Sequence, residues 1–180
     1  MINNISFKSK FGWISIVEKD KKISSIFFGK VKNKGKSKIL IKMKKDINDF
    51  FNQKKKNIKT KIIFKGSKLQ IKIWRELYKI PYGKTKSYQE IAKKVNTSPR
   101  YVGNVCGQNK HLILIPCHRV VRSDGKLGGF SAPGGVKTKK KLLNLEKSYT
   151  FEFRMEITAS ETSVVSIFGC SETICLTKSE

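Results

Sequence analysis

Residues 112–121 read Leu-Ile-Leu-Ile-Pro-Cys-His-Arg-Val-Val, an apolar run that leads into a thiol and an imidazole. The run predicts a buried strand, and the polar turn at 123–125 follows it. A cysteine becomes a strong nucleophile when it is deprotonated, and a nearby histidine commonly promotes that step at neutral pH. The stretch therefore predicts a reactive cysteine, Cys117, beside His118 at the end of a buried strand.

The charge of the chain points to a polyanionic partner. The 180 residues, enough for one domain or two small ones, include 39 Lys and Arg against 13 Asp and Glu, a formal charge of +26. Such a field attracts nucleic acids, although a lysine-rich composition alone would also produce it. The excess lies in the body up to Lys147, at +29, whereas the tail 148–180 carries −3. We expect an acidic tail of unknown role.

The N-terminus and the cysteines indicate the compartment. Residues 1–4 do not resemble a signal peptide, and no apolar stretch reaches the length of a membrane span, so we expect no membrane association. No cysteine precedes Cys106, and the spacing of the four cysteines forms no disulfide framework. We expect a cytoplasmic protein, associated with the nucleoid in a prokaryote.

The first third of the chain has the pattern of a small α/β unit. Apolar residues alternate over 12–17 and 23–28, and the polar residues 19–22 between them predict a hairpin. Apolar spacing over 36–56 predicts a basic helix, and 61–64 predicts a further strand. Gly66-Ser67 is a candidate boundary. We therefore expect an N-terminal domain over 1–65 and a second domain over 66–147.

The second domain is predicted to begin with helices. The spacing over 69–78 predicts one helix, and Ser87 with Glu90 has the form of a capping box that opens another, ending near Val95. Ser98 and Pro99 then predict the start of a third. Two short helices with a short turn suggest a DNA-binding helix-turn-helix, and simple core packing is the alternative.

The third of these helices places Arg100, Gly103 and Gly107 on one face. A glycine inside a helix costs about 1 kcal/mol relative to alanine, so two on one face indicate close approach to DNA or to another part of the protein. Arg100 could enter a groove or fill the gap that a flipped base leaves in the stack. The alternative is a surface arginine on a tightly packed helix.

Several motifs together resemble the O6-alkylguanine-DNA alkyltransferases, also called methylated-DNA–protein-cysteine methyltransferases. The resemblance is specific over 66–147 and loose in the N-terminal half, where it rests mainly on Phe11-Gly12-Trp13. The motifs are Gly66-Ser67-Lys68-Leu69-Gln70, Ile80-Pro81-Tyr82-Gly83-Lys84-Thr85, Ser87-Tyr88, Pro99-Arg100-Tyr101-Val102-Gly103, Asn109, Ile115-Pro116-Cys117-His118-Arg119-Val120-Val121, Gly128-Gly129-Phe130-Ser131-Ala132-Pro133-Gly134-Gly135 and Leu142-Leu143-Asn144-Leu145-Glu146. This resemblance implies an α/β (α+β) fold, with a small N-terminal antiparallel sheet and helix of the ribonuclease H-like type. A mainly helical C-terminal domain with a helix-turn-helix would follow.

The resemblance also implies direct reversal of DNA damage. The family flips an O6-alkylated guanine out of the duplex and moves the alkyl group to a cysteine, here Cys117, in one irreversible turnover; O4-alkylthymine is a further candidate lesion. Neighbours in an extended chain project in different directions, so a water is expected to link Cys117 to His118. Glu146 would hold the imidazole, as in the Glu–His–water–Cys relay of the family.

The same match assigns roles to the remaining site residues. Tyr88 would donate its hydroxyl to a ring nitrogen of the leaving guanine, and Asn109 would brace the helix-turn-helix against the active-site strand. The other expected contacts are with DNA or the flipped base, and they involve Arg100, Gly103, Pro116, Val120, Phe130 and Ser131. The partner would be double-stranded DNA bound through its minor groove. We expect a monomer without cofactor or metal.

Four other interpretations compete with this one. A zinc site would use Cys106, His111, Cys117 and His118, but adjacent residues do not readily face one ion and no CxxC pair occurs. A cysteine-dependent hydrolase would use Cys117, His118 and Glu146 for acyl transfer, but the charge of +26 and the helix-turn-helix pattern argue against this class of enzyme. A non-enzymatic alkyltransferase-like protein that only marks lesions would lack the reactive cysteine. Finally, Cys117 could be an inert core residue.

Overall fold

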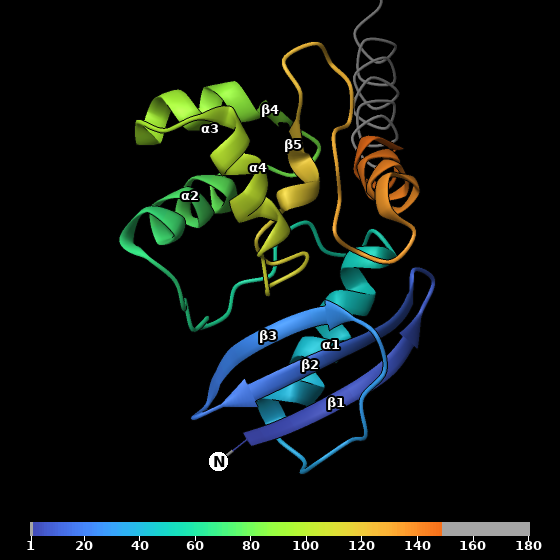
Figure 1. Ribbon diagram of the computed structural model, residues 1–180. Coiled ribbons are helices and arrows are strands. Elements are labelled where there is room, and N and C mark those ends of the chain that lie inside the picture. The colour runs from blue at the N-terminus through green and yellow to red at the C-terminus, as the bar shows by residue number, and fades with distance from the viewer. Residues whose placement is uncertain (1, 149–180) are drawn as a thin grey trace, which may run out of the picture.

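The computed structural model describes residues 2–148, and its first part is a three-stranded antiparallel sheet (Figure 1). The strands β1 (Ile2–Ser9), β2 (Gly12–Lys19) and β3 (Lys22–Phe28) pair in the order β1-β2-β3. The tight turn between β2 and β3 places Asp20 and Lys21 at φ values of 50° and 58°, as a two-residue hairpin loop requires. The predicted hairpin over 19–22 is confirmed.

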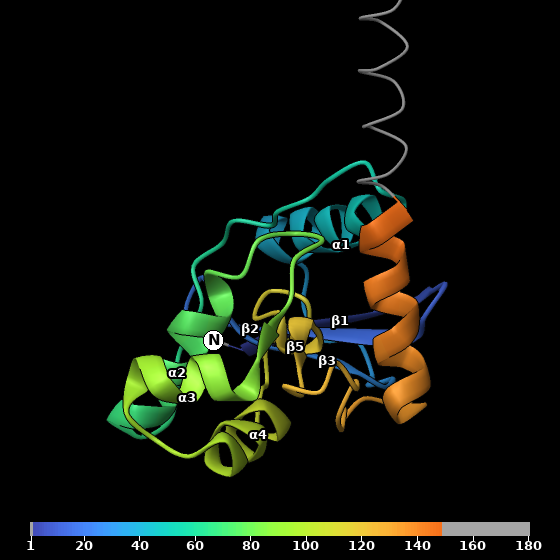
Figure 2. The same cartoon turned by 90° about the horizontal axis from the view of Figure 1, so that it is seen from above.

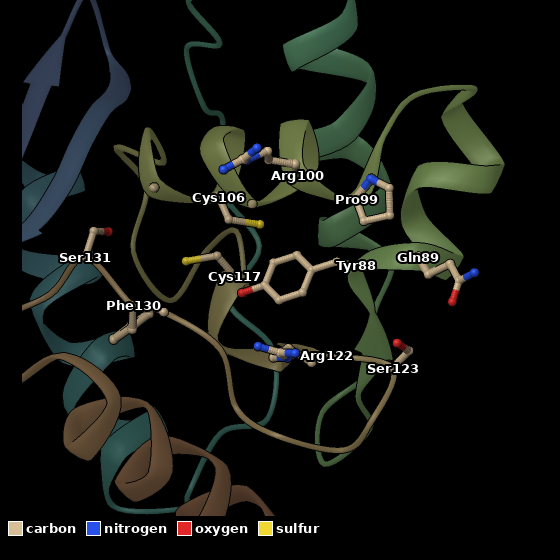
Figure 3. A pocket seen from close by; sticks show the side chains of 13 residues that line it. Tyr88, Gln89, Pro99, Arg100, Cys106, Cys117, Arg122, Ser123, Phe130 and Ser131 are labelled. Carbon is tan, nitrogen blue, oxygen red and sulfur yellow. The ribbon is translucent and has the colours of Figure 1, made fainter.

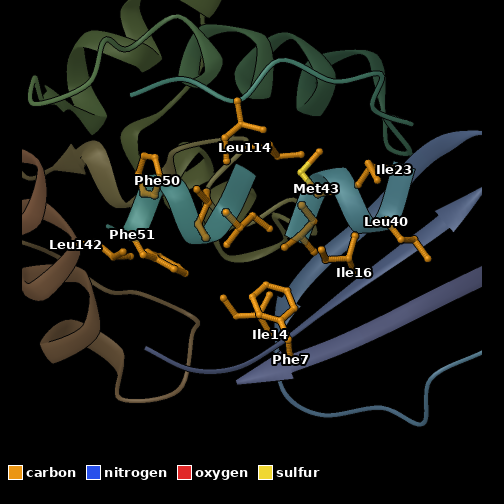
Figure 4. Packing of buried hydrophobic residues seen from close by; sticks show 14 of the residues in the cluster. Phe7, Ile14, Ile16, Ile23, Leu40, Met43, Phe50, Phe51, Leu114 and Leu142 are labelled. Carbon is orange, nitrogen blue, oxygen red and sulfur yellow. The ribbon is translucent and has the colours of Figure 1, made fainter. Parts of the chain in front are cut away.

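Helix α1 (Lys38–Phe51) covers one face of this sheet (Figure 4). It begins after Ser37, whose hydroxyl accepts a hydrogen bond from Ile39 N at 3.1 Å, and is shorter at both ends than the predicted helix over 36–56. Its apolar face packs against β2 and β1, and residues of all three strands join it in the first core. The buried members of that core include Leu40, Met43, Ile47, Phe50, Ile14, Ile16, Ile23 and Ile26.

The strand predicted over 61–64 is wrong. The segment makes one parallel bridge, in which Ile23 N donates to Lys61 O at 2.9 Å and Ile63 N donates to Ile23 O at 2.9 Å. Further along the same edge, Ile26 bonds to residues 110–112 instead. Two separate segments thus satisfy the edge of β3, and neither has a long enough ladder to form a fourth strand.

The second part of the chain is mainly helical and has its own core. Helices α2 (Lys68–Tyr78), α3 (Tyr88–Val95) and α4 (Pro99–Gly107) pack together, and a further helix spans 135–148. The short strands β4 (Lys86–Ser87) and β5 (Val120–Val121) pair in parallel. The predicted helix over 69–78, the capping box at Ser87 and the start after Ser98 are confirmed.

The strand predicted over 112–115 is also wrong, although its burial is confirmed. Ile113 has a φ of 72°, and Ile115 N donates to His111 O at 2.8 Å, so the segment turns back on itself. Ile113 and Leu114 belong to the first core, whereas Ile115 belongs to the second. A continuous apolar run cannot distinguish a strand from a turn that is buried between two cores.

The segment leads directly into a short 3-10 helix, η1 (Cys117–Arg119), which carries the thiol. The predicted domain boundary between 65 and 66 stays a prediction. The two parts are in contact, because Leu142 of the second part packs in the first core. The predictions for the acidic tail lie outside the described residues, apart from Ser148 at its start.

The capping box of α3 provides a direct test of the local structure. The Ser87 hydroxyl accepts from Glu90 N at 3.0 Å, and Ser87 N donates to the Glu90 carboxylate at 2.6 Å. A Ser87→Ala variant is expected to lose about 1 kcal/mol of unfolding free energy, measured by urea denaturation. The exposed neighbour Thr85→Ala is the control, and equal losses in both variants would contradict the capping role.

Candidate active site

The predicted nucleophile borders a cavity of about 650 Å³ between α3, α4 and the loop at 129–131 (Figure 3). Cys117, Tyr88 and Arg100 line it from three different elements, and Phe130 lines it from that loop. The cavity is large enough for a small-molecule group or a single base. The geometry thus brings together, at one opening, residues that are up to 43 positions apart in the sequence.

The thiol of Cys117 is held by Asn109. Asn109 Nδ2 donates to Cys117 Sγ at 3.2 Å and to Ile115 O at 2.8 Å, while its Oδ1 accepts from His111 N at 2.8 Å. One buried amide therefore fixes the turn at 111–115 and places a donor on the sulfur. Burial raises the pKa of the Cys117 thiol, and the Asn109 hydrogen bond and the charge of Lys139 act in the opposite direction.

His118, which follows Cys117 directly in the chain, forms a buried pair with Glu146. His118 Nε2 lies 2.8 Å from Glu146 Oε1, and neither side chain is exposed to solvent. Burial lowers the pKa of His118 in spite of the carboxylate, so the imidazole is neutral at neutral pH. Its Nδ1 has no hydrogen-bond partner among residues 2–148. With Nε2 donating to Glu146, Nδ1 carries the lone pair that can accept a proton.

Arg119, to which the sequence motifs assign no role, clamps Glu146. Arg119 Nε lies 3.1 and 3.0 Å from the two carboxylate oxygens, Nη2 lies 2.9 Å from Oε1, and Nη1 donates to Ile80 O at 2.6 Å. Gly83 N adds a further donor at 3.0 Å. Burial alone would raise the pKa of Glu146, but the hydrogen bonds and charges of His118 and Arg119 hold it at about 2.

Lys139 is a second buried charged residue at the site that the sequence motifs do not single out. Its side chain is fully buried, and Nζ donates to the carbonyl oxygens of Val120 at 2.6 Å and of Leu127. The Tyr88 hydroxyl lies 3.4 Å from the same ammonium. Lys139 shares one helical face with Leu142, Leu143 and Glu146, all buried. The helical spacing of Lys139 with the apolar residues Leu142 and Leu143 is the sequence signal that could identify it.

The charge of Lys139 is expected to favour the thiolate of Cys117. A Lys139→Met variant removes the cation, so the pKa of the Cys117 thiol should rise further. The pH dependence of Cys117 alkylation by iodoacetamide, followed by peptide mass spectrometry, measures the shift. Lys140→Met changes an exposed neighbour and serves as the control. An unchanged pH profile in Lys139→Met, with the fold intact by circular dichroism, would contradict the electrostatic role.

Tyr88 is placed with its ring across the cavity (Figure 3). A Cβ atom at Gly128, where φ is 67°, would lie 3.0 Å from the Tyr88 ring, so a glycine at that position makes room for it. Burial and the two nearby thiols, Cys106 and Cys117, raise the pKa of Tyr88 to about 12. The hydroxyl therefore stays protonated and can act as a hydrogen-bond donor.

The glycine face of α4 is open and not tightly packed against protein. A Cβ atom at Gly107 would meet no atom within 4 Å, and one at Gly103 would meet only the Tyr88 ring at 3.9 Å. Both glycines and the exposed Arg100 border the cavity. The interpretation of Arg100 as a surface residue on a tightly packed helix is therefore wrong for this face.

The remaining predicted contact residues divide into two groups. Phe130 and Ser131 line the cavity. Pro116 is buried and borders a separate small cavity, and Val120 is fully buried with its carbonyl oxygen on Lys139. The structure therefore does not bring these last two side chains to the same opening as Cys117.

Residues 2–148 contain neither a group of side chains suited to a metal ion nor a helix suited to crossing a membrane. In this range, no three His, Cys, Asp or Glu side chains are grouped so that they could hold a metal ion. None of the helices in it combines the length and the apolar character that a bilayer crossing requires.

Comparison with known proteins agrees with the geometry. Residues 68–148 match the family model described as the DNA-binding domain of 6-O-methylguanine DNA methyltransferase. A methylated-DNA–protein-cysteine methyltransferase of Metallosphaera sedula is 35% identical over 151 residues, which cover 82% of this chain and 95% of that protein. One of Mycobacterium tuberculosis is 44% identical over 86 residues, covering 47% of this chain and 51% of that protein.

The fold comparison extends over most of the described chain. The crystal structure of Mycobacterium tuberculosis OGT in complex with DNA has a TM-score of 0.73 and 28% sequence identity, covering 81% of this chain and 93% of that chain. For two other curated relatives, of Candida albicans and Mycobacterium bovis, the chain spans about half of their length or less. The near-complete match to the Metallosphaera protein nevertheless decides the family. The chain belongs to the methylated-DNA–protein-cysteine methyltransferases.

Proposed function

We propose that the protein repairs alkylated DNA by moving the alkyl group of an O6-alkylguanine to Cys117, with O4-alkylthymine as a further candidate lesion. The observation that carries the proposal is the buried thiol of Cys117 at the cavity, with the Asn109 amide on its sulfur and with His118, the next residue in the chain, paired with Glu146. Free cysteine is only a few per cent ionised at neutral pH, so alkyl transfer needs a base. His118 is neutral and has a free lone pair on Nδ1.

The proposed reaction is a displacement at carbon. A water between Cys117 and His118 relays the thiol proton to Nδ1, and the thiolate attacks the alkyl carbon opposite O6. The S–C bond forms as the C–O6 bond breaks, and the electron pair of that bond leaves with guanine. Tyr88 donates a hydrogen bond to a ring nitrogen of the leaving base, which stabilises the developing charge. The product is a thioether, so each molecule reacts once.

DNA is proposed to dock on the helix pair α3 and α4 as a helix-turn-helix in the minor groove. Arg100 and the open glycine face of α4 lie at the rim of the cavity, which supports insertion of Arg100 into the stack when a base is flipped. The OGT of Mycobacterium tuberculosis, which shares the fold, is found in complex with DNA, and this supports DNA as the partner here. The ribonuclease H-like type of the N-terminal sheet and a cytoplasmic location stay predictions.

A non-enzymatic lesion-binding protein is the alternative function. Such a protein would need the cavity and the DNA face but no nucleophile. Cys117 is held by Asn109 and is followed by His118, which is paired with Glu146, and this arrangement favours alkyl transfer over lesion binding alone.

Mass spectrometry of the intact protein and its peptides tests the proposal directly. The protein is incubated with duplex DNA that contains one O6-methylguanine. A stoichiometric gain of one methylene mass on the Cys117 peptide, absent in Cys117→Ala, is expected. Tight lesion binding without a mass gain would move the assignment to the lesion-binding alternative, and neither transfer nor binding would refute both.

A further inference from the structure

The N-terminal half carries a positive surface that alkyl transfer does not use. Residues 1–65 contain 19 Lys and no Arg against four acidic residues. Two of those acids, Glu18 and Asp46, are only 5% exposed, and Asp46 is paired with Lys55 at 2.5 Å. The surface of this half therefore presents lysines with few opposing carboxylates.

Three of these lysines form a stripe on α1, here called the α1 stripe: Lys38, Lys42 and Lys45. At about 100° per residue, they lie on one side of the helix, opposite the side that packs into the first core. All three are exposed, and none forms an ion pair with another residue in the described range 2–148.

The start of α1 is electrostatically unfavourable as it stands. Lys38 lies in the first turn, which contains no acidic residue. The N-terminus of a helix carries partial positive charge, so cations there are destabilising and anions are stabilising. A phosphate bound along the stripe would offset the repulsion between Lys38 and the positive end of the helix, and it would supply the negative charge that the first turn lacks.

The α1 stripe also faces away from the proposed catalytic side. Figure 2 shows α1 and α4 on opposite sides of the molecule, and the cavity is bordered by α4. A duplex held at the cavity is thus on the other side from the stripe. Lysines arranged along one helix favour phosphate contacts, which are independent of base sequence.

We propose that the α1 stripe binds the phosphate backbone of a second DNA duplex, so that one protein molecule holds two DNA segments at once. This surface goes beyond the proposed alkyl transfer, because it needs neither a lesion nor Cys117. Holding two segments allows the protein to pass from one to the other while it searches for damage.

A capture experiment with the full-length protein tests the proposal. Undamaged duplex is fixed to beads, protein is added at low salt, and a second, fluorescent duplex of unrelated sequence is supplied. The wild-type protein is expected to retain the second duplex, and Lys38→Gln/Lys42→Gln/Lys45→Gln to retain about fivefold less. Since each phosphate contact contributes about 0.9 to the slope of log K against log salt, the slope for the second duplex should fall by up to about 2.7.

The control has the same charge change without the stripe. Lys8→Gln/Lys22→Gln/Lys61→Gln alters three exposed lysines on other segments and should retain the second duplex. Equal losses in both variants would mean that net charge alone acts, and no capture by the wild-type protein, or capture undiminished in the stripe variant, would also overturn the proposal. Alkyl transfer to a short lesion duplex should be unchanged in the stripe variant. If the wild type captures a second duplex but transfers no alkyl group, the proposed function fails and the stripe stands.

Discussion

Alkyl transfer by a Glu146→Gln variant is expected to be at least about 100-fold slower than that of the wild-type protein. The carboxylate accepts from His118 Nε2 at 2.8 Å, which keeps Nδ1 unprotonated and stabilises the imidazolium after the thiol proton is transferred. A glutamine can instead donate its amide to Nε2, which moves the ring proton to Nδ1 and removes the base. Single-turnover rates with an O6-methylguanine duplex measure the effect.

The same variant has a second readout in its acid stability. The pKa of Glu146 is held at about 2, below its ordinary 4.5, so its contribution to stability is present above about pH 4.5 and is lost as the pH falls through 2. This lowering of the Glu146 pKa corresponds to about 3 kcal/mol of unfolding free energy. The stability gap between wild type and Glu146→Gln, measured by urea denaturation, should therefore narrow between pH 5 and pH 2.5. A stability difference that does not change with pH would contradict an ionised Glu146. An unchanged rate of alkyl transfer would contradict its role in the proton relay through His118.

The sequence predicted the local elements whose signals are local. The hairpin at 19–22, the helices after Ser87 and Ser98, and the end of α3 near Val95 depend on caps and turns within a few residues, and the helix predicted over 69–78 depends on apolar spacing along one face. The strands predicted over 61–64 and 112–115 failed because tertiary contacts decide those segments. There, the edge of β3 is shared by two segments, and Asn109 supplies the bonds that a partner strand would otherwise make.

The candidate site shows the same division. Cys117, Tyr88 and Arg100 were predicted from motifs, and they border one cavity. Arg119 and Lys139 were not predicted to matter, because their roles depend on what surrounds them when they are buried. Arg119 reaches a carboxylate 27 positions away, and Lys139 reaches a carbonyl 19 positions away. Neither separation is a helical or strand period, so the partners of these two side chains do not follow from the sequence, although the helical spacing of Lys139 with Leu142 and Glu146 is itself visible there.

Replacement of Arg119 by methionine is expected to destabilise the protein by about 3–5 kcal/mol, because it leaves a buried carboxylate without its main cationic partner. Arg119 is 4% exposed, and Glu146 is fully buried. The variant should also react more slowly, since the carboxylate would no longer be fixed beside His118. Urea denaturation at neutral pH gives the stability, and Arg119→Lys, which keeps the charge but not the fork of donors, should recover part of it.

A double-mutant cycle separates the charge from the shape of the side chain. If the loss in Arg119→Met comes from an unpaired buried charge, the same holds for Glu146→Gln, which leaves the guanidinium unpaired. The double variant Arg119→Met/Glu146→Gln contains neither charge. Its loss of unfolding free energy should therefore be smaller than the sum of the two single losses, by at least about 2 kcal/mol. Additive losses would instead assign the cost to packing and to the Arg119 bond with Ile80 O. Alkyl transfer should stay slow in the double variant, because restored stability does not restore the carboxylate that His118 requires.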